Sequence, residues 1–277
     1  MVAEILRPKT LGEAARLASM PGSAVLGGGT WLNATAARPA LVSGPLALVS
    51  LENLGLDFVE WRNAALRLGA AATFQQVLDA PGVPEVVRTA MTATASRTLR
   101  NMITVGGELG HCPPDSVLIP VLAALDGLVH VAGRRPLGIV EYRAARAVGP
   151  VGLVVEVSAS DADRPCGVSS LARTSHGKRS LVIAVSAARF LPKLTRVRVV
   201  ASDCRGQVLR LADAEVALEG SPLPAKDRIE SMVRAAFWPT SDLHASTEYK
   251  RYLAGVYAAD LLHGLAAREA SDREAAS

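Results

Sequence analysis

The stretch that decides the fold is Thr98–Gly127, which reads TLRNMITVGGELGHCPPDSVLIPVLAALDG. A short β-prone run, Met102–Val105, ends at the pair Gly106–Gly107, and after a polar turn Asp115 or Ser116 can cap an apolar helix. Two adjacent glycines leave backbone N–H groups uncovered and permit positive φ. Such a turn can cradle an anion, typically a phosphate. The alternative is a tight strand-to-helix turn without a ligand.

A second glycine cluster follows a short apolar strand nearer the N-terminus. Ala24–Asn33 reads AVLGGGTWLN, with a hydroxyl at Thr30 directly after three glycines. Two such turns can hold one extended, phosphate-bearing ligand between them. Neither turn continues as Gly-Lys-Ser/Thr, and neither fits Gly-x-Gly-x-x-Gly. A Walker A loop and a Rossmann fingerprint are therefore both excluded.

These two motifs carry a family resemblance. Leu26-Gly-Gly-Gly-Thr30 and Arg100-Asn-Met-Ile-Thr-Val-Gly-Gly107 resemble the two flavin-binding motifs of the FAD subunit of molybdenum hydroxylases, the xanthine dehydrogenase and carbon monoxide dehydrogenase family. Arg7–Ala14 is similar to the opening of that subunit, and His244–Leu253 is similar to its closing helix. The resemblance covers essentially the whole chain, in the family's order and spacing.

The order of strand and helix patterns predicts an α+β protein, and the resemblance implies the same layout. It implies a two-subdomain FAD-binding domain of the PCMH-like kind over 1–162, with subdomains of about 1–54 and 55–162. A small antiparallel sheet with helices is expected to form a C-terminal domain over 163–270. The polar tail 271–277 is expected to be disordered.

Local patterns predict individual elements. Capping-box spacing at Thr10 and Glu13, and again at Thr73 and Gln76, predicts two helices. Polar and glycine residues at Asp203–Gly206 are typical of a hairpin turn. The ranges expected as strands are Ala24–Leu26, Leu46–Ser50, Leu66–Gly69, Leu128–Ala132, Val151–Val157, Leu181–Val185, Arg196–Ala201 and Val208–Leu211.

Two of these patterns also predict burial. Side chains of Arg196, Val197, Arg198 and Val199 alternate in polarity, which is typical of a half-exposed antiparallel strand. A closing helix is expected from about Ser246 to Arg268, and its residues Tyr249, Tyr252, Leu253 and Val256 recur at helical spacing. Such spacing favours a buried face rather than a ligand site.

The resemblance implies that both motifs hold FAD, with the pyrophosphate on the first. Trp31 stands where the family frequently has Asp, and Arg173 stands where it has Lys. Near the expected flavin ring, Glu108 replaces a usual Asn, and Val117 replaces an Asp that hydrogen-bonds the ring. The implied site residues are Leu26, Gly27, Gly28, Gly29, Thr30, Trp31, Thr104, Gly106, Gly107, Glu108, His111, Val117 and Arg173.

The resemblance also implies a function. The chain is expected to be an oxidoreductase subunit whose FAD passes electrons from iron–sulfur clusters of a partner to an external acceptor. Molybdopterin and [2Fe-2S] clusters are expected on a large molybdenum subunit and an iron–sulfur subunit, in a heterotrimer or its dimer. Substrate hydroxylation is expected on the molybdenum subunit, so this chain carries no catalytic residue. Two alternatives stay open: a flavin-free structural subunit, and an independent flavin reductase that oxidises NADH.

Composition limits the remaining functions. The 277 residues have a net charge of +4, and no basic run is interleaved with aromatics, so nucleic acid is not an expected partner. The three cysteines show no Cys-x-x-Cys spacing, which gives no support for zinc or an iron–sulfur cluster on this chain. No uncharged run reaches the ~20 residues of a membrane span. Because Glu4 and Arg7 lie in a start without an apolar segment, no signal peptide is expected, and the expected location is the cytoplasm.

Overall fold

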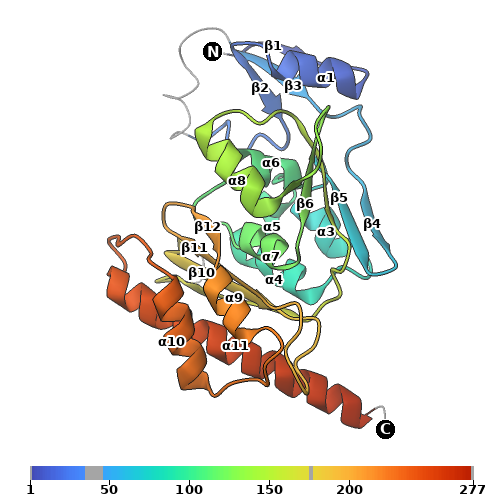
Figure 1. Cartoon of the computed structure of the whole chain (residues 1–277). Coiled ribbons are helices and arrows are strands. Elements are labelled where there is room, and N and C mark those ends of the chain that lie inside the picture. The colour runs from blue at the N-terminus through green and yellow to red at the C-terminus, as the bar shows by residue number, and fades with distance from the viewer. Residues whose placement is uncertain (1, 35–45, 175–176, 276–277) are drawn as a thin grey trace. The chain divides into compact units, whose positions relative to one another are not determined.

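The computed structural model describes residues 2–34, 46–174 and 177–275 (Figure 1). The chain forms two compact units, and each takes segments from separate parts of the sequence. The first unit consists of Met1–Val83, Ala95–Cys112 and Gly127–Ser160, and the second consists of Pro84–Thr94, Pro113–Asp126 and Asp161–Ser277. Both units combine helices with β-sheet, as the α+β prediction requires. The predicted domain boundary near residue 162 stays a prediction.

The N-terminal part of the first unit is a three-stranded parallel sheet. Its strands are β1 (Val2–Leu6), β2 (Ser23–Leu26) and β3 (Leu46–Ser50), in the order β1-β3-β2. Helix α1 (Leu11–Ala18) connects β1 to β2, and the hydroxyl of Thr10 caps it by accepting a hydrogen bond from the Glu13 amide at 3.2 Å. Because β2 and β3 are parallel neighbours, with Leu26 paired to Ser50, their carboxyl ends meet at one edge.

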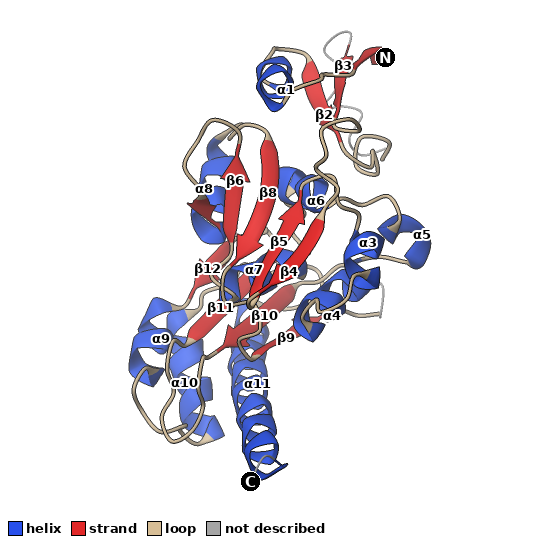
Figure 2. Ribbon diagram, turned by 90° about the vertical axis from the view of Figure 1, so that its right-hand side faces the viewer, coloured by secondary structure: helices blue, strands red, loops and turns tan. Residues whose placement is uncertain are grey.

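The rest of the first unit is built on a five-stranded antiparallel sheet (Figure 2). Its order is β4 (Val59–Arg62), β5 (Ala65–Gly69), β8 (Val154–Ala159), β6 (Leu128–Val131) and β7 (Leu137–Gly138). The helices of this part are α3 (Phe74–Asp79), α5 (Arg97–Arg100), α6 (Val105–His111) and α8 (Ile139–Val148). The predicted capping box of α3 is confirmed, because the Thr73 hydroxyl accepts from the Gln76 amide at 3.2 Å and Gln76 Oε1 accepts from the Thr73 amide at 2.8 Å.

The second unit is a four-stranded antiparallel sheet with helices on both faces. The strand order is β12 (Val208–Arg210), β11 (Arg198–Asp203), β10 (Leu181–Ser186) and β9 (Cys166–Leu171). Its helices are α4 (Glu85–Thr94), α7 (Leu118–Ala124), α9 (Ala212–Leu218), α10 (Lys226–Ala236) and α11 (Thr247–Ala275). Ile183 and Val199 belong to the core shared with α10 and α11 (Figure 1). On the other face the Ser186 hydroxyl donates to the Ala124 carbonyl of α7 at 2.6 Å.

The alternation predicted for residues 196–199 is confirmed. Val197 and Val199 are buried, whereas Arg196 is exposed and Arg198 is partly exposed. From Val199 to Asp203 every residue of β11 is buried, because helices cover both faces of the sheet and alternate residues face two apolar layers.

One prediction for the C-terminal region is wrong, and a second is confirmed only in part. Helix α11 extends to Ala275, so residues 271–275 are helical instead of disordered. Tyr249 and Tyr252 are 49% and 46% exposed, but Leu253, from the same predicted face, packs against the core. Helix α10 approaches α11 closely, because a Cβ on Gly255 would lie 2.8 Å from the Glu230 carbonyl oxygen.

A partly buried ion network lies just after the end of α7 in the second unit. The Arg164 side chain is fully buried, and its Nη1 donates to Asp126 Oδ2 at 3.0 Å. Arg198 Nε donates to the other oxygen of Asp126 at 2.6 Å. Burial acts to raise the pKa of Asp126, but the hydrogen bonds from Arg198 and Arg164 outweigh it and hold that pKa below its ordinary value.

Candidate cofactor site

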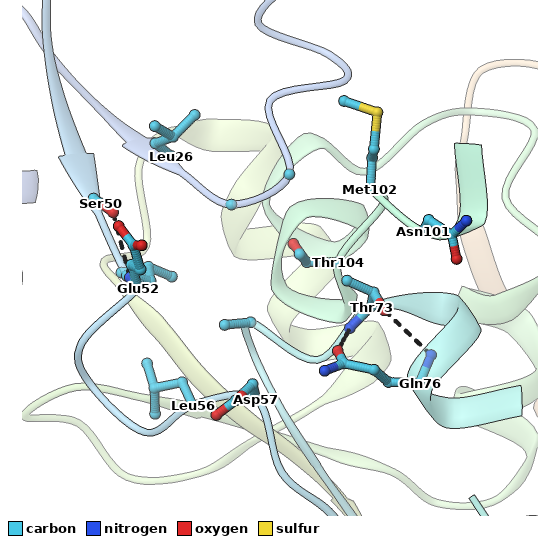
Figure 3. A pocket seen from close by; sticks show the side chains of 14 residues that line it. Leu26, Ser50, Glu52, Leu56, Asp57, Thr73, Gln76, Asn101, Met102 and Thr104 are labelled. Carbon is cyan, nitrogen blue, oxygen red and sulfur yellow. Dashed lines mark hydrogen bonds between the residues drawn. The ribbon is translucent and has the colours of Figure 1, made fainter. Parts of the chain in front are cut away.

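A cavity of about 480 Å³ lies at the carboxyl ends of β2 and β3, within the first unit (Figure 3). This volume is in the range of small-molecule sites. The two strands contribute their last residues, Leu26 and Ser50, and the segments that follow them form one side of the cavity. The lining residues are Leu26, Gly27, Gly28, Ser50, Leu51, Glu52, Leu56, Asp57, Ala71, Thr73, Gln76, Asn101, Met102 and Thr104.

The two glycine motifs pack against each other beside this cavity. A Cβ placed on Gly28 would lie 1.4 Å from the carbonyl oxygen of Met102, and one on Gly27 would lie 2.5 Å from Thr104 Oγ1. The backbone of the first motif therefore approaches the second motif at a distance that only glycine allows. The sequence predicted two turns that clasp the two ends of one extended ligand, and that use stays a prediction, whereas the structure shows the two motifs in direct contact.

The second motif differs from its prediction. Residues 102–104 form no strand, and Gly106 and Gly107 lie in the first turn of α6. The amides of residues 105–108 all donate within the chain, so the inference that the Gly-Gly pair leaves them uncovered is wrong. The four bonds are Val105 N to Ala72 O at 2.9 Å, Gly106 N to Ala70 O at 2.8 Å, Gly107 N to Thr104 Oγ1 at 3.0 Å and Glu108 N to Thr104 O at 2.9 Å.

The glycine at position 106 has a packing function instead. A Cβ on Gly106 would lie 2.7 Å from both the Cβ and the carbonyl oxygen of Ala70. The first turn of α6 therefore lies directly against the chain that leaves β5. Thr104, which is 5% exposed, begins α6 as its N-cap and also lines the cavity.

The first motif keeps its amides available. Within the described residues, the N–H groups of Gly28, Gly29 and Thr30 donate to no backbone or side-chain acceptor. Gly29 has a φ of +71°, a conformation that favours glycine. Three consecutive N–H groups that are free to donate hydrogen bonds beside a cavity can bind an anion.

An aromatic pair follows these amides. The indole of Trp31 and the imidazole of His111 have ring centroids 4.7 Å apart, with planes inclined by 34°. Trp31 comes directly after Thr30, and His111 is the last residue of α6. Trp31 is 37% exposed, and His111 is exposed as well. The pair connects the end of the first glycine motif to the helix that contains the second.

The remaining predicted site residues fall into two groups. Glu108 is 5% exposed, so its side chain is buried in the first unit. Val117 and Arg173 belong to the second unit. Val117 is 2% exposed and directly precedes α7, whereas Arg173 is exposed and donates from Nη2 to the Leu243 carbonyl at 3.4 Å. All other predicted site residues lie in the first unit.

Several polar cavity residues were missed by sequence reasoning. Ser50, Glu52, Asp57, Gln76 and Asn101 all line the cavity, and Figure 3 shows their side chains around one space. The available signal was the parallel pairing of two short strands, because the segments after neighbouring parallel strands share an edge. That pairing was not inferred, so the segment after β3 was not considered.

In the described part of the chain, potential metal ligands do not cluster, and burial disfavours the thiolate forms of Cys112 and Cys166. Within residues 2–34, 46–174 and 177–275, no group of three potential ligand side chains is arranged to hold a metal ion. Burial raises the pKa of Cys112, and it raises the pKa of Cys166 to about 12, so both thiols stay protonated at neutral pH. In the same part of the chain, no helix combines the length and apolar character that a bilayer crossing requires.

A cavity at the carboxyl ends of parallel strands, beside uncovered amides, defines the chain as a candidate nucleotide-cofactor-binding protein. Residues 1–145 match the family described as FAD binding domain in molybdopterin dehydrogenase. The chain belongs to this family, which confirms the predicted family and its cofactor, FAD.

Similar proteins support this assignment over nearly the whole chain. Protein YgfM of Escherichia coli strain K12 is 33% identical over 264 residues, with 94% of this chain and 95% of YgfM covered. The medium subunit of nicotine 6-hydroxylase from Paenarthrobacter nicotinovorans is 28% identical over 248 residues, with 83% and 84% covered. Reconstituted CO dehydrogenase from Oligotropha carboxidovorans has the same fold, with a TM-score of 0.82 at 19% identity over 97% of this chain and 98% of that chain.

Proposed function

We propose that this chain binds FAD beside β2 and β3 and acts as the electron-transferring flavoprotein subunit of a molybdenum hydroxylase. The observation that carries the proposal is the run of uncovered amides at Gly28, Gly29 and Thr30, next to a cavity of about 480 Å³. A pyrophosphate bears about two negative charges, which amide clusters can bind without an arginine. The residues present therefore fit the cofactor of the family.

The chain's own contribution is binding and orientation. The first glycine motif would hold the diphosphate, and the polar side chains of the cavity would hold a nucleoside through hydrogen bonds. Thr104 would act indirectly, since its hydroxyl caps α6 and fixes the wall against which Gly27 packs. Bound FAD supplies a carrier that accepts and releases electrons singly or in pairs. The protein tunes that carrier through the groups beside it and needs no acid or base of its own.

The proposed electron transfer requires partner subunits. The name of a relative, nicotine 6-hydroxylase medium subunit, supports membership of a multi-subunit hydroxylase. Electrons would enter from iron–sulfur clusters of one partner, and a large molybdenum subunit would hydroxylate the substrate. We expect a cytoplasmic heterotrimer or its dimer.

A flavin-free structural subunit is the second candidate. It is favoured by Glu108, a buried carboxyl where the family has a neutral amide, and by the apolar Val117 where it has Asp. Neither residue contributes to the amides of the first motif. The first candidate therefore remains the better supported, because the diphosphate-binding backbone does not depend on these two positions.

The experiment is native mass spectrometry of the complex purified from its own cells, with cofactor extraction. We expect one FAD for each copy of this chain, together with an iron–sulfur subunit and a molybdenum subunit. A complete complex that contains no flavin would establish the structural role instead. A chain isolated alone, at its native abundance and under mild conditions, would refute the proposed complex.

A further inference from the structure

The Trp31–His111 pair has no assigned role in the packing of the first unit. An exposed indole is unusual because burial of a large aromatic surface is favourable. Trp31 nevertheless keeps 37% of its surface exposed, and its ring contacts an exposed imidazole 4.7 Å away. The two rings come from segments far apart in the sequence, so the fold brings them together into one exposed aromatic surface.

The position of the pair along the first motif suggests its ligand. In the first glycine motif, Leu26, Gly27 and Gly28 line the cavity. The amides without an acceptor belong to residues 28–30, and Trp31, the next residue, does not line the cavity. Along the chain, the free amides therefore come between the last residue of this motif that lines the polar cavity and the first residue of the aromatic pair. A dinucleotide has the same order, with one heteroaromatic ring on each side of a diphosphate.

Resting on the proposed binding of FAD, we propose that Trp31 and His111 form the platform on which the isoalloxazine ring stacks, while the cavity takes the adenosine. An electron-rich indole and an electron-poor isoalloxazine are complementary stacking partners. The cavity suits the other end, since the carboxylates of Glu52 and Asp57 can accept hydrogen bonds from ribose hydroxyls or an adenine amine.

The test compares Trp31→Leu with Trp238→Leu in the full-length protein. Trp238 is 68% exposed in the second unit, so its replacement controls for loss of a surface indole. Affinities for FAD and for ADP are measured by titration calorimetry, with circular dichroism as a check of folding. We expect Trp31→Leu to weaken FAD by roughly tenfold or more and ADP by less than twofold. Trp238→Leu should change neither affinity.

Each other result has a distinct meaning. Equal loss of FAD and ADP in Trp31→Leu would overturn the assignment and place adenine on the pair. Unchanged FAD affinity would overturn the platform itself while leaving the proposed function intact. A wild-type protein that binds ADP but no FAD would overturn the proposed function and the platform together.

Spectroscopy gives a second route that does not depend on the stability of one variant. An indole stacked on oxidised flavin produces a broad absorbance tail beyond the flavin's own bands, and flavin quenches indole fluorescence. We expect both signals in the wild type, reduced signals in Trp31→Phe, and intermediate FAD affinity in His111→Ala, which keeps the indole. A wild-type complex without the absorbance tail, and with the fluorescence of Trp31 unquenched, would contradict the proposal.

Discussion

The substitution Gly28→Ala tests the central contact of the site. The new Cβ would lie 1.4 Å from the Met102 carbonyl oxygen, whereas non-bonded heavy atoms are in favourable contact near ~3.5 Å. The two segments would have to separate by about 2 Å. Both atoms belong to or directly adjoin the backbone, so no side-chain rotation relieves the overlap.

The expected effect is large. Overpacking by a methyl group destabilises a protein by about 1–3 kcal/mol even where side chains can adjust, and here the first motif must move as a whole. At about 2–4 °C per kcal/mol for a protein of this size class, we expect the unfolding midpoint to fall by roughly 5–10 °C. We also expect FAD binding to be lost, because the amides of residues 28–30 move with the backbone.

The assay is differential scanning fluorimetry together with FAD titration, and Gly110→Ala is the matched control. Gly110 lies in α6, where a Cβ meets no atom within 4 Å. The control should keep its FAD and gain up to about 1 kcal/mol, since alanine favours a helix over glycine. If Gly28→Ala matched this control in both midpoint and FAD affinity, the close packing of the two motifs would be refuted.

Three further changes probe the units separately. Thr104→Val removes the hydroxyl cap of α6 and should destabilise by about 1 kcal/mol in urea, whereas Thr104→Ser should not. Asp126→Asn leaves the buried Arg164 without its carboxylate and should cost about 3 kcal/mol at pH 7. Because the folded-state pKa of Asp126 is lowered, its contribution is present above about pH 4 and lost as the pH falls further, so the difference from wild type should shrink in acid. Lys250→Met removes the cation paired with Asp242 in the second unit and should lower the free energy of unfolding in urea, and an unchanged value would contradict this.

Local patterns predicted the elements that depend on neighbours in sequence. The capping box at Thr73 and the strand Leu46–Ser50 were both located correctly, because caps and apolar runs act over a few residues. Helix α8 and strand β4 were missed, and both carry charged residues that obscure the apolar period. The run 102–105 was read as a strand from β-prone side chains, but the hydrogen bonds of α6 override that preference.

Long-range contacts account for the errors at the candidate site. The glycine motifs were recognised, but their chemistry depends on which amides find acceptors elsewhere. The amide of Gly106 donates a hydrogen bond to the carbonyl oxygen of Ala70, a residue that no local sequence pattern connects to it. The Trp31–His111 contact likewise joins two segments whose proximity becomes visible only in the fold.

The interleaved construction of the two units has a consequence for synthesis. The chain passes between the units after residues 83, 94, 112, 126 and 160. All residues of α7 are buried, yet β10 and β11, on which this helix packs, are translated considerably later. During synthesis the apolar surface of α7 therefore stays exposed until β10 and β11 have been translated. Exposed apolar surface of this kind is what chaperones bind, so we expect them to bind the nascent chain. A fragment ending at Ser160 would retain that helix permanently uncovered, and we expect it to aggregate where the full chain stays soluble.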